Sequence, residues 1–266
     1  MTISKDRMTG LLKNDSYPRS AKYDPEWVLK GWMGPNVLWL TEWLCEKMDL
    51  KPGMRVLDMG CGKARSSIFL AREYGVQVWA NDLWITATEN LGYIREMGLE
   101  DSVFPIHAEA HDLPYAGEFF DAIVSLDSYQ YYGTDDIYLT YFHKFVKPGG
   151  QISIVVPGLA RDFPGGNVPE HLARPQANGR VFWQPECWCF HTADWWQRHW
   201  AQTGLVDMEV SDLLPDGWKD WAQFEKAAEE TGLSLFPSDE ETLKADAGEY
   251  IGLVRVVGRR KDEPGL

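Results

Sequence analysis

The feature that most constrains the fold of this chain is the regular alternation of strand-like and helix-like segments between residues 55 and 157. Short apolar runs rich in Val, Ile and Leu alternate with segments whose apolar residues recur at helical spacing. Such alternation is typical of a parallel sheet with helices on both faces. The expected strands are 55–60, 76–82, 103–109, 120–128 and 151–157, and the expected helices are 64–74, 85–97 and 136–145.

The segments outside this region predict further parts of an α/β fold. Two more strands are expected at 205–214 and 250–260, with a helix at 218–230 between them. The first twenty or so residues are polar and lack sustained periodicity, which predicts an arm or flap, and a helix is expected at 37–48. We expect four parts: an N-terminal arm and helical cap (1–49), a Rossmann-like core (50–157), an aromatic lid insertion (158–204), and the late strands with their helix, which complete the sheet (205–266).

Charge and cysteine content exclude several classes of protein. The 266 residues carry a formal net charge of -14, which argues against a nucleic-acid partner, because phosphate binding requires clustered Lys and Arg. No apolar run has the length of a membrane span. Four irregularly spaced cysteines and an N-terminus without an apolar signal core predict a soluble, cytoplasmic protein. A homodimer is compatible with the sequence.

The stretch VLDMGCGKARSS, residues 56–67, leads an apolar strand into a turn with Gly60 and Gly62. Paired glycines let the backbone approach a ligand closely, and the N-terminus of the following helix attracts an anionic group. Ligands of open α/β sheets lie at the carboxyl ends of the strands, where Asp82 also falls. Because one carboxylate can accept hydrogen bonds from both hydroxyls of a ribose, these residues predict a nucleotide-type cofactor.

Residues 34 to 157 resemble the class I S-adenosylmethionine-dependent methyltransferases. The motifs that carry the resemblance, in order, are VLDMGCGKA (56–64), the acid Asp82 after the second strand, AEAHDLPY (108–115), FDAIVSLDS (120–128) and FVKPGGQISI (145–154). In two departures, Glu109 replaces a usual aspartate and Ala64 a frequent glycine. The resemblance implies a seven-stranded, doubly wound Rossmann-like sheet, mostly parallel with a late antiparallel strand, and methyl transfer from S-adenosylmethionine.

The resemblance also implies roles for individual residues. The turn from Asp58 to Gly62 would line the methionine end of the cofactor, Asp82 would hold the ribose, and Leu83 would pack beside the adenosine. Glu109 and Ala110 would meet the adenine, and Asp127 would border the reacting methyl. The residues expected to bind the cofactor are thus Asp58, Gly60, Cys61, Gly62, Asp82, Leu83, Glu109, Ala110 and Asp127.

The acceptor is expected to be a small molecule with a nitrogen, oxygen, sulfur or carbon nucleophile. Aromatic residues crowd the N-terminal segment, the residues after the fourth strand and the lid, where they suit a cationic group or simply pack the lid onto the sheet. His191, in the lid, is the first candidate for a general base. The residues expected to act in catalysis are Asp127, Tyr129, Tyr131 and His191.

Alternatives stay open for the cysteines and for the function. The stretch CWCFH, residues 187–191, supplies soft ligands, but the chain has no second cysteine pair, so reduced thiols and no metal are expected. A non-catalytic sensor or partner subunit that binds S-adenosylmethionine would keep the same pocket. An enzyme that transfers a group other than methyl from the sulfonium of S-adenosylmethionine would also keep this pocket. An NAD-dependent oxidoreductase would use the same turn and Asp82, but it does not explain AEAHDLPY or VKPGG.

Overall fold

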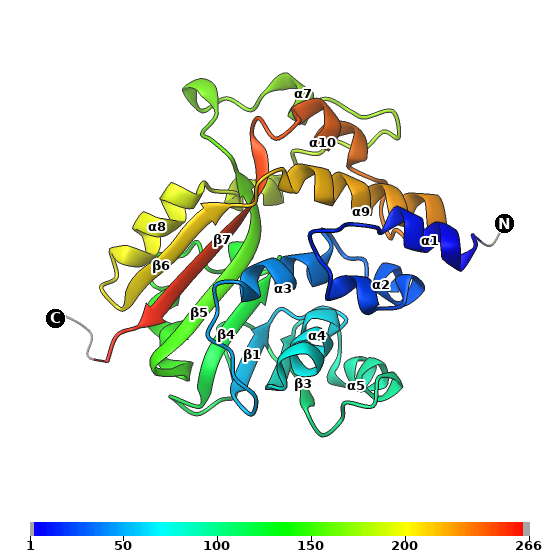
Figure 1. Cartoon of the computed structure of the whole chain (residues 1–266). Coiled ribbons are helices and arrows are strands. Elements are labelled where there is room, and N and C mark those ends of the chain that lie inside the picture. The colour runs from blue at the N-terminus through cyan, green and yellow to red at the C-terminus, as the bar shows by residue number, and fades with distance from the viewer. Residues whose placement is uncertain (1–2, 263–266) are drawn as a thin grey trace.

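A seven-stranded sheet forms the centre of the computed structural model, which describes residues 3–262 (Figure 1). The strands run in the order β3-β2-β1-β4-β5-β7-β6, and β7 is antiparallel to both of its neighbours, whereas the other pairs are parallel. The predicted Rossmann-like sheet, mostly parallel with a late antiparallel strand, is confirmed. The strands are β1 (Arg55–Met59), β2 (Gln77–Asp82), β3 (Val103–His107), β4 (Phe120–Leu126), β5 (Val146–Leu159), β6 (Val206–Leu213) and β7 (Ile251–Arg260).

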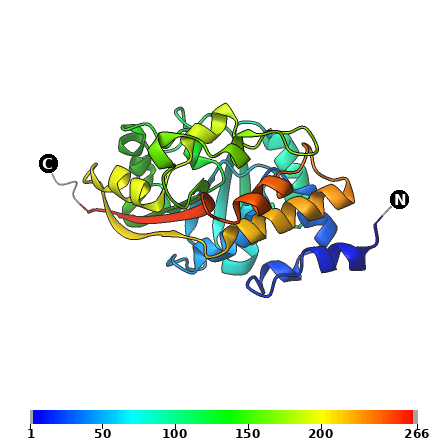
Figure 2. The same cartoon turned by 90° about the horizontal axis from the view of Figure 1, so that it is seen from above.

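Both faces of the sheet are covered by helices, which explains the apolar strand sequences. In β1, the neighbours Val56 and Leu57 are both fully buried, but they point into different hydrophobic layers. Seen from above, α9 (Gly217–Thr231) and the N-terminal helices lie on one side, and α8 (Ala193–Ala201) lies on the other (Figure 2). A strand buried on both faces has no solvent side, so its sequence is a continuous apolar run.

The core helices begin close to the predicted positions but are often shorter. They are α3 (Val37–Cys45), α4 (Arg65–Tyr74), α5 (Ala87–Glu96) and α6 (Tyr138–Phe142). After α6 the chain continues as a 3-10 turn, His143–Phe145, and β5 then begins at Val146, ahead of its predicted start at 151. A register shift in the pairing of β4 with β5 accommodates the extra residues that contain the KPGG turn.

The N-terminal segment differs from the expected arm, because it is helical and packs against the C-terminal part of the chain. It contains α1 (Lys5–Leu11) and α2 (Pro25–Lys30). The Tyr17 hydroxyl donates to the Asp220 carboxylate on α9 at 2.6 Å. The Gln223 amide, also on α9, donates to the Leu11 carbonyl at 2.8 Å. These contacts join segments about two hundred residues apart, so periodicity within the first twenty residues could not reveal them.

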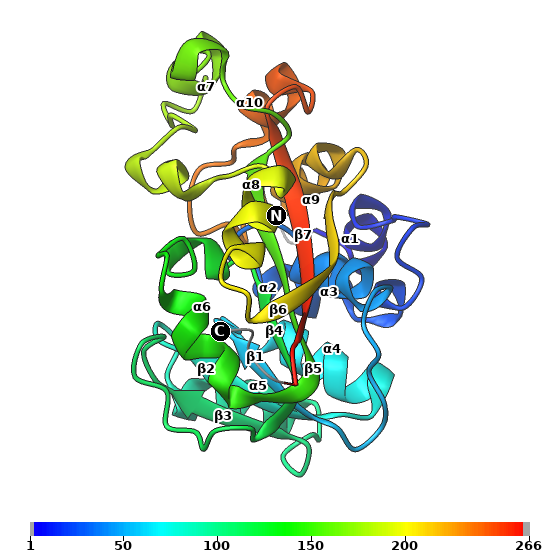
Figure 3. The same ribbon diagram turned by 90° about the vertical axis from the view of Figure 1, so that its left-hand side faces the viewer.

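The helix α10 (Glu240–Asp246), which the sequence analysis also did not predict, follows α9. It lies beside α7 (Glu170–Ala173), which belongs to the long excursion between β5 and α8, at the carboxyl end of the parallel strands (Figures 1 and 3). The Arg180 guanidinium of this excursion donates to Asp239, directly before α10, at 2.8 Å. At seven residues, α10 is too short to show a clear helical period.

None of the helices between Ile3 and Asp262 combines the length and the apolar character that a membrane crossing requires.

Candidate active site

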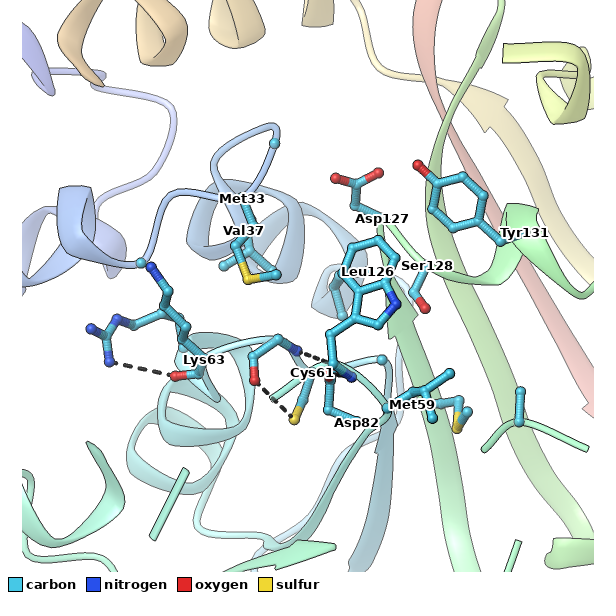
Figure 4. A pocket seen from close by; sticks show the side chains of 18 of the residues that line it. Met33, Val37, Met59, Cys61, Lys63, Asp82, Leu126, Asp127, Ser128 and Tyr131 are labelled. Atoms are coloured by element: carbon cyan, nitrogen blue, oxygen red, sulfur yellow. Dashed lines mark hydrogen bonds between the residues drawn. The ribbon is translucent and has the colours of Figure 1, made fainter. Parts of the chain in front are cut away.

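A pocket opens at the carboxyl ends of β1, β2 and β4, where the sequence analysis placed a ligand (Figure 4). It is bounded by the turn after β1, by the residues after β2 and β4, and by the segment that leads into α3. Met33 and Val37 face Asp127 and Tyr131 across it. The lining residues are Gly31, Met33, Gly34, Pro35, Val37, Met59, Gly60, Cys61, Gly62, Lys63, Arg65, Asp82, Leu83, Trp84, Glu109, Ala110, Leu126, Asp127, Ser128, Tyr131 and Tyr132.

The turn after β1 needs its two glycines for both conformation and space. Gly60 has φ +74° and Gly62 has φ +52°, the left-handed region that disfavours side chains. A Cβ atom on Gly60 would lie 1.9 Å from Ser128 Oγ, and one on Gly62 would lie 2.9 Å from Met33 Sδ. The two glycines therefore let the loop after β4 and the segment before α3 approach the floor of the pocket.

Asp82 holds this turn and the start of the next loop. Its Oδ2 accepts from Gly62 N at 2.7 Å, and its Oδ1 accepts from Trp84 N and Ile85 N, both at 2.8 Å (Figure 4). Asp82 lines the pocket although it is buried. A carboxylate offers about four lone-pair positions, so Asp82 retains capacity to accept from a ligand.

Asp58 lies beneath the turn and does not line the pocket. It is fully buried, and its Oδ2 accepts from the hydroxyls of Ser66 and Ser67 at the start of α4, both at 2.6 Å. Its Oδ1 has no hydrogen-bond partner. Burial raises the pKa of Asp58 to about 6. In this position Asp58 joins the end of β1 to the first turn of α4.

Glu109 and Ala110 line the pocket on the side of β3. The Glu109 carboxylate accepts from His111 N and from His111 Nδ1, both at 2.8 Å. The hydrogen bond from the His111 side chain is the main reason why the pKa of Glu109 lies below its usual value. The Ala110 carbonyl accepts from the Tyr138 hydroxyl at 3.0 Å, which anchors this segment to α6.

Asp127 directly follows β4 and has a strained conformation at the pocket wall. Its φ is +52°, which is rare for a residue with a side chain and recurs at ligand sites. Its Oδ1 accepts from Gln130 Nε2 at 3.0 Å. Burial raises the pKa of Asp127 to about 7. Leu83 and Tyr131 also line the pocket, and both side chains are largely exposed.

Tyr129 and His191, two residues expected in catalysis, are not among the pocket-lining residues. Tyr129 is fully buried under the turn after β4, with its ring 5.6 Å from the Trp200 ring centroid. His191 stacks on Trp195 at 3.7 Å between ring centroids, and burial lowers its pKa to about 4. Its backbone carbonyl accepts from Leu159 N at 3.1 Å, at the end of β5.

Tyr132, which was not among the expected catalytic residues, lines the pocket instead of Tyr129. Its hydroxyl lies 3.2 Å from both Ser125 Oγ and Ser128 Oγ. The chain forms a 3-10 turn over Tyr129–Tyr131, which directs Tyr131 to the pocket and Tyr129 to the core. The sequence YQYY does not reveal which rings point inwards, because that depends on the direction of the turn.

Other residues that line the pocket were also not predicted from the sequence. Met33, Gly34 and Val37 come from the segment before and at the start of α3. Lys63 comes from the turn before α4, and Arg65 is the first residue of α4. A Cβ atom on Gly34 would lie 2.3 Å from Asp127 Oδ2, so this glycine marks a close approach. The pair of glycines in GWMGPN, residues 31–36, was the available signal for this wall.

The cysteines are all free thiols. Cys187 Sγ donates to the Phe182 carbonyl at 3.4 Å, and Cys189 Sγ donates to the Glu186 carbonyl at 2.8 Å. Within residues 3–262, no group of three or more His, Cys, Asp or Glu side chains is arranged to hold a metal ion. Cys61 lines the ligand pocket at the glycine turn.

The strand order defines a Rossmann-like α/β fold, and the pocket lies at the strand ends, where folds of this class bind their ligands. Residues 56–150 match the family model described as a methyltransferase domain. The chain is 34% identical over 127 residues to methyltransferase GfsG of Streptomyces halstedii, covering 46% of each chain. The predicted resemblance to the class I S-adenosylmethionine-dependent methyltransferases is thereby confirmed.

Solved structures confirm the fold over a longer part of the chain. A geranyl diphosphate methyltransferase in complex with SAM aligns with a TM-score of 0.65 at 17% identity, covering 98% of this chain and 96% of the other. The [4+2]-cyclase SpnF aligns with a TM-score of 0.61 at 18% identity, covering 84% and 80%. The chain spans less than half the length of the first curated relatives that it matches.

Proposed function

We propose that this protein transfers a methyl group from S-adenosylmethionine to a small-molecule acceptor. The observation that supports this most is the arrangement of the pocket floor, where a positive-φ turn with two glycines is bonded to the Asp82 carboxylate. That arrangement suits a nucleoside with an amino-acid tail. The match to a methyltransferase domain over residues 56–150 favours the sulfonium cofactor over NAD.

The residues present fit this cofactor at each end. Asp82, with about one lone-pair position unused, would accept from a ribose hydroxyl, and Leu83 would pack beside the adenosine. Glu109 and Ala110 would meet the adenine, and the backbone of Gly60, Cys61 and Gly62 would contact the methionine half. When bound, S-adenosylmethionine supplies a methyl group that is already electrophilic. The chain's tasks are therefore to orient the acceptor and to exclude water.

We assign the acceptor side of the pocket to Asp127 and Tyr131. Asp127 lines the pocket with a pKa near neutrality, so it can accept a proton from an N–H, O–H or S–H acceptor during transfer. Tyr131, exposed at the wall beside it, offers an aromatic surface. Tyr129 and His191 take no contact role in this assignment, because neither lines the pocket. Asp58 acts by holding the turn, through Ser66 and Ser67.

The partner would be a small molecule rather than a nucleic acid. A net charge of -14 repels a phosphate backbone, and the pocket is walled on several sides by the segment before α3 and the loops after β2 and β4. We place the protein in the cytoplasm, which agrees with its four free thiols.

Calorimetric titration with S-adenosylmethionine, S-adenosylhomocysteine and NAD tests the cofactor assignment. We expect binding of the two sulfur nucleosides and none of NAD. Asp82→Ala should weaken S-adenosylhomocysteine binding by about 10-fold or more, because a ribose hydroxyl loses its acceptor and the glycine turn loses its bond from Gly62 N. Binding of NAD alone would contradict the proposal.

Asp121→Ala is the matched control for the Asp82 variant. Asp121 also accepts a backbone N–H, from Arg55 at 2.7 Å, but it lies at the amino end of β4, away from the pocket. A thermal melt of both variants separates lost binding from lost folding. Equal affinities in the parent and in Asp82→Ala would exclude the ribose assignment.

The mass of the product separates the alternatives that keep the cofactor. Incubation with S-adenosylmethionine and a panel of amines, phenols, thiols and carbon acids should yield an acceptor heavier by one methyl group. Transfer of another group would give a different mass increment. Cofactor binding without turnover of any acceptor would favour a sensor or partner subunit.

A further inference from the structure

Arg65 is a buried cation at the edge of the pocket. It is the first residue of α4, its exposed fraction is 3%, and it lines the pocket. Its guanidinium carbon lies 4.1 Å from the ring centroid of Trp27 and 5.0 Å from that of Tyr93. These two rings hold the guanidinium in place, and guanidinium N–H groups bind planar anions such as carboxylates.

Within residues 3–262, no carboxylate oxygen lies within 4.0 Å of the Arg65 side-chain nitrogens, and Arg65 Nε has no hydrogen-bond partner. Its one hydrogen bond, from Nη1 to the Lys63 carbonyl, is long at 3.5 Å. Arg255 is equally buried but fully paired, since it donates to both carboxylate oxygens of Asp212 at 3.0 and 2.7 Å.

An unpaired buried charge is costly, so buried charges are normally paired. Burial lowers the pKa of Arg65 to about 10, which still leaves the guanidinium protonated at neutral pH. The N-terminus of α4, a ten-residue helix, adds further positive potential at the same place. These observations point to an anion that arrives with the ligand.

The position of Arg65 indicates which part of the ligand carries that anion. Arg65 follows the glycine turn after Lys63 and Ala64, and the backbone of that turn is bonded to Asp82 at Gly62 N. Asp127 and Tyr131, assigned above to the acceptor, come from the loop after β4. We propose that Arg65 binds the carboxylate of the amino-acid half of S-adenosylmethionine. This assignment rests on the proposed function.

Gly31, at the end of α2, leaves room for the observed Arg65 side chain. A Cβ atom on Gly31 would lie 2.6 Å from Arg65 Cγ and 2.8 Å from Arg65 Nε. Its φ of -82° is accessible to alanine, so the obstacle is contact with Arg65 and not backbone strain. Gly31→Ala should therefore displace the guanidinium while keeping its charge.

The test compares two nucleosides that differ in the amino-acid tail. S-adenosylhomocysteine carries the carboxylate, and 5′-methylthioadenosine lacks it. Arg65→Gln should weaken S-adenosylhomocysteine binding by about 10- to 100-fold and change 5′-methylthioadenosine binding by less than about twofold. Arg72→Gln is the matched control, because Arg72 lies on the same helix and donates to the Met97 carbonyl, away from the pocket. It should leave both affinities unchanged.

Gly31→Ala should reproduce the selective loss of S-adenosylhomocysteine affinity that is expected for Arg65→Gln. Because Gly31→Ala keeps the charge of Arg65, this agreement would show that the loss is not a general effect of removing a charge. Unchanged S-adenosylhomocysteine affinity in Arg65→Gln would overturn the assignment, and would be expected if Arg65 held an anionic group of the acceptor. Equal weakening of the binding of both nucleosides in Arg65→Gln would also overturn the assignment of Arg65 to the carboxylate. If the folded parent binds neither nucleoside, the proposed function itself fails, which is a distinct result.

Discussion

Ala64 occupies a left-handed conformation, with φ +56°, directly before α4. Related motifs frequently have glycine here, and the structure gives the physical reason: a Cβ atom in this region costs about 1–2 kcal/mol. The chain nevertheless keeps a buried alanine at this position. The alanine that replaces this frequent glycine thus places local strain beside the pocket floor.

Ala64→Gly should stabilise the protein by about 0.5–1 kcal/mol, because the relief of strain exceeds the added freedom of the unfolded chain. The free energy of unfolding in urea measures this. Ala71→Gly, in the interior of the same helix, should have the opposite effect and destabilise by about 1 kcal/mol. Destabilisation by both glycines would show that Ala64 is not strained.

Asp127 is the residue whose ionisation should control turnover. Burial raises its pKa to about 7, and a carboxyl group acts as a base only when ionised. With an acceptor that must lose a proton, we expect the rate to rise with pH up to about 7 and then level off. Asp127→Asn should lower the rate by about 100-fold or more and abolish this dependence. An unchanged pH profile in the variant would exclude Asp127 as the base.

At the scale of elements, a buried polar cluster joins α9 to α10 and to the excursion after β5. Glu225 on α9 accepts from Asp239 N at 3.3 Å and from Trp221 Nε1 at 3.4 Å. Asp239 in turn accepts from Arg180 and from Gln176, at 2.8 and 3.0 Å. Burial, followed by the charge of Asp239, raises the pKa of Glu225 to about 7.

This raised pKa predicts how stability depends on pH. The folded state binds the Glu225 proton more tightly than the unfolded state, so its stabilising effect is complete below pH 4.5 and is lost as pH rises to about 7. Glu225→Gln should therefore become more stable relative to the parent across this window, by at most about 1.4 kcal/mol per pH unit. Urea denaturation at several pH values measures the difference.

Glu229→Gln is the control for Glu225→Gln, because Glu229 lies on the same helix but is exposed. Its stability relative to the parent should stay nearly constant with pH. A similar constancy for Glu225→Gln would mean that Glu225 is ionised in the folded protein throughout the window.

Across the whole molecule, Arg255 on β7 connects the end of the chain to its N-terminal cap. Its guanidinium donates to the Trp43 carbonyl of α3 at 2.7 Å and stacks on the Trp43 ring at 4.2 Å. On its other side it binds Asp212 of β6 with two hydrogen bonds. The cap and the last two strands are thereby joined through one buried side chain.

Arg255→Lys should destabilise the protein by about 2–4 kcal/mol, because an ammonium cannot reproduce the planar fork and the ring contact. Arg259→Lys is the control on the same strand: Arg259 also binds two acids, Glu209 and Asp49, but it is more exposed. It should cost less than about 1 kcal/mol. If urea denaturation gave the same loss of unfolding free energy for both variants, burial of the arginine would not determine the cost of its replacement by lysine.

Short-range sequence patterns determined the sheet and much of the pocket floor. Apolar runs predict strands because the strands are buried on both faces, and paired glycines predict a turn such as Gly60–Gly62, where side chains do not fit. The acid Asp82 was found for a similar reason, since the end of a parallel strand places it at the ligand edge. All of these signals lie within a few residues of the feature that they predict.

Tertiary structure alone decided the direction of several side chains around the pocket. Asp58 lies under the floor and accepts from the Ser66 hydroxyl of α4, Tyr129 enters the core, and Arg65 reaches the pocket although it was not an expected site residue. The N-terminal segment docks on α9 through Tyr17 and Asp220. The physical reason is the same in each case: the direction of a side chain depends on packing between residues far apart in sequence, which local periodicity does not record.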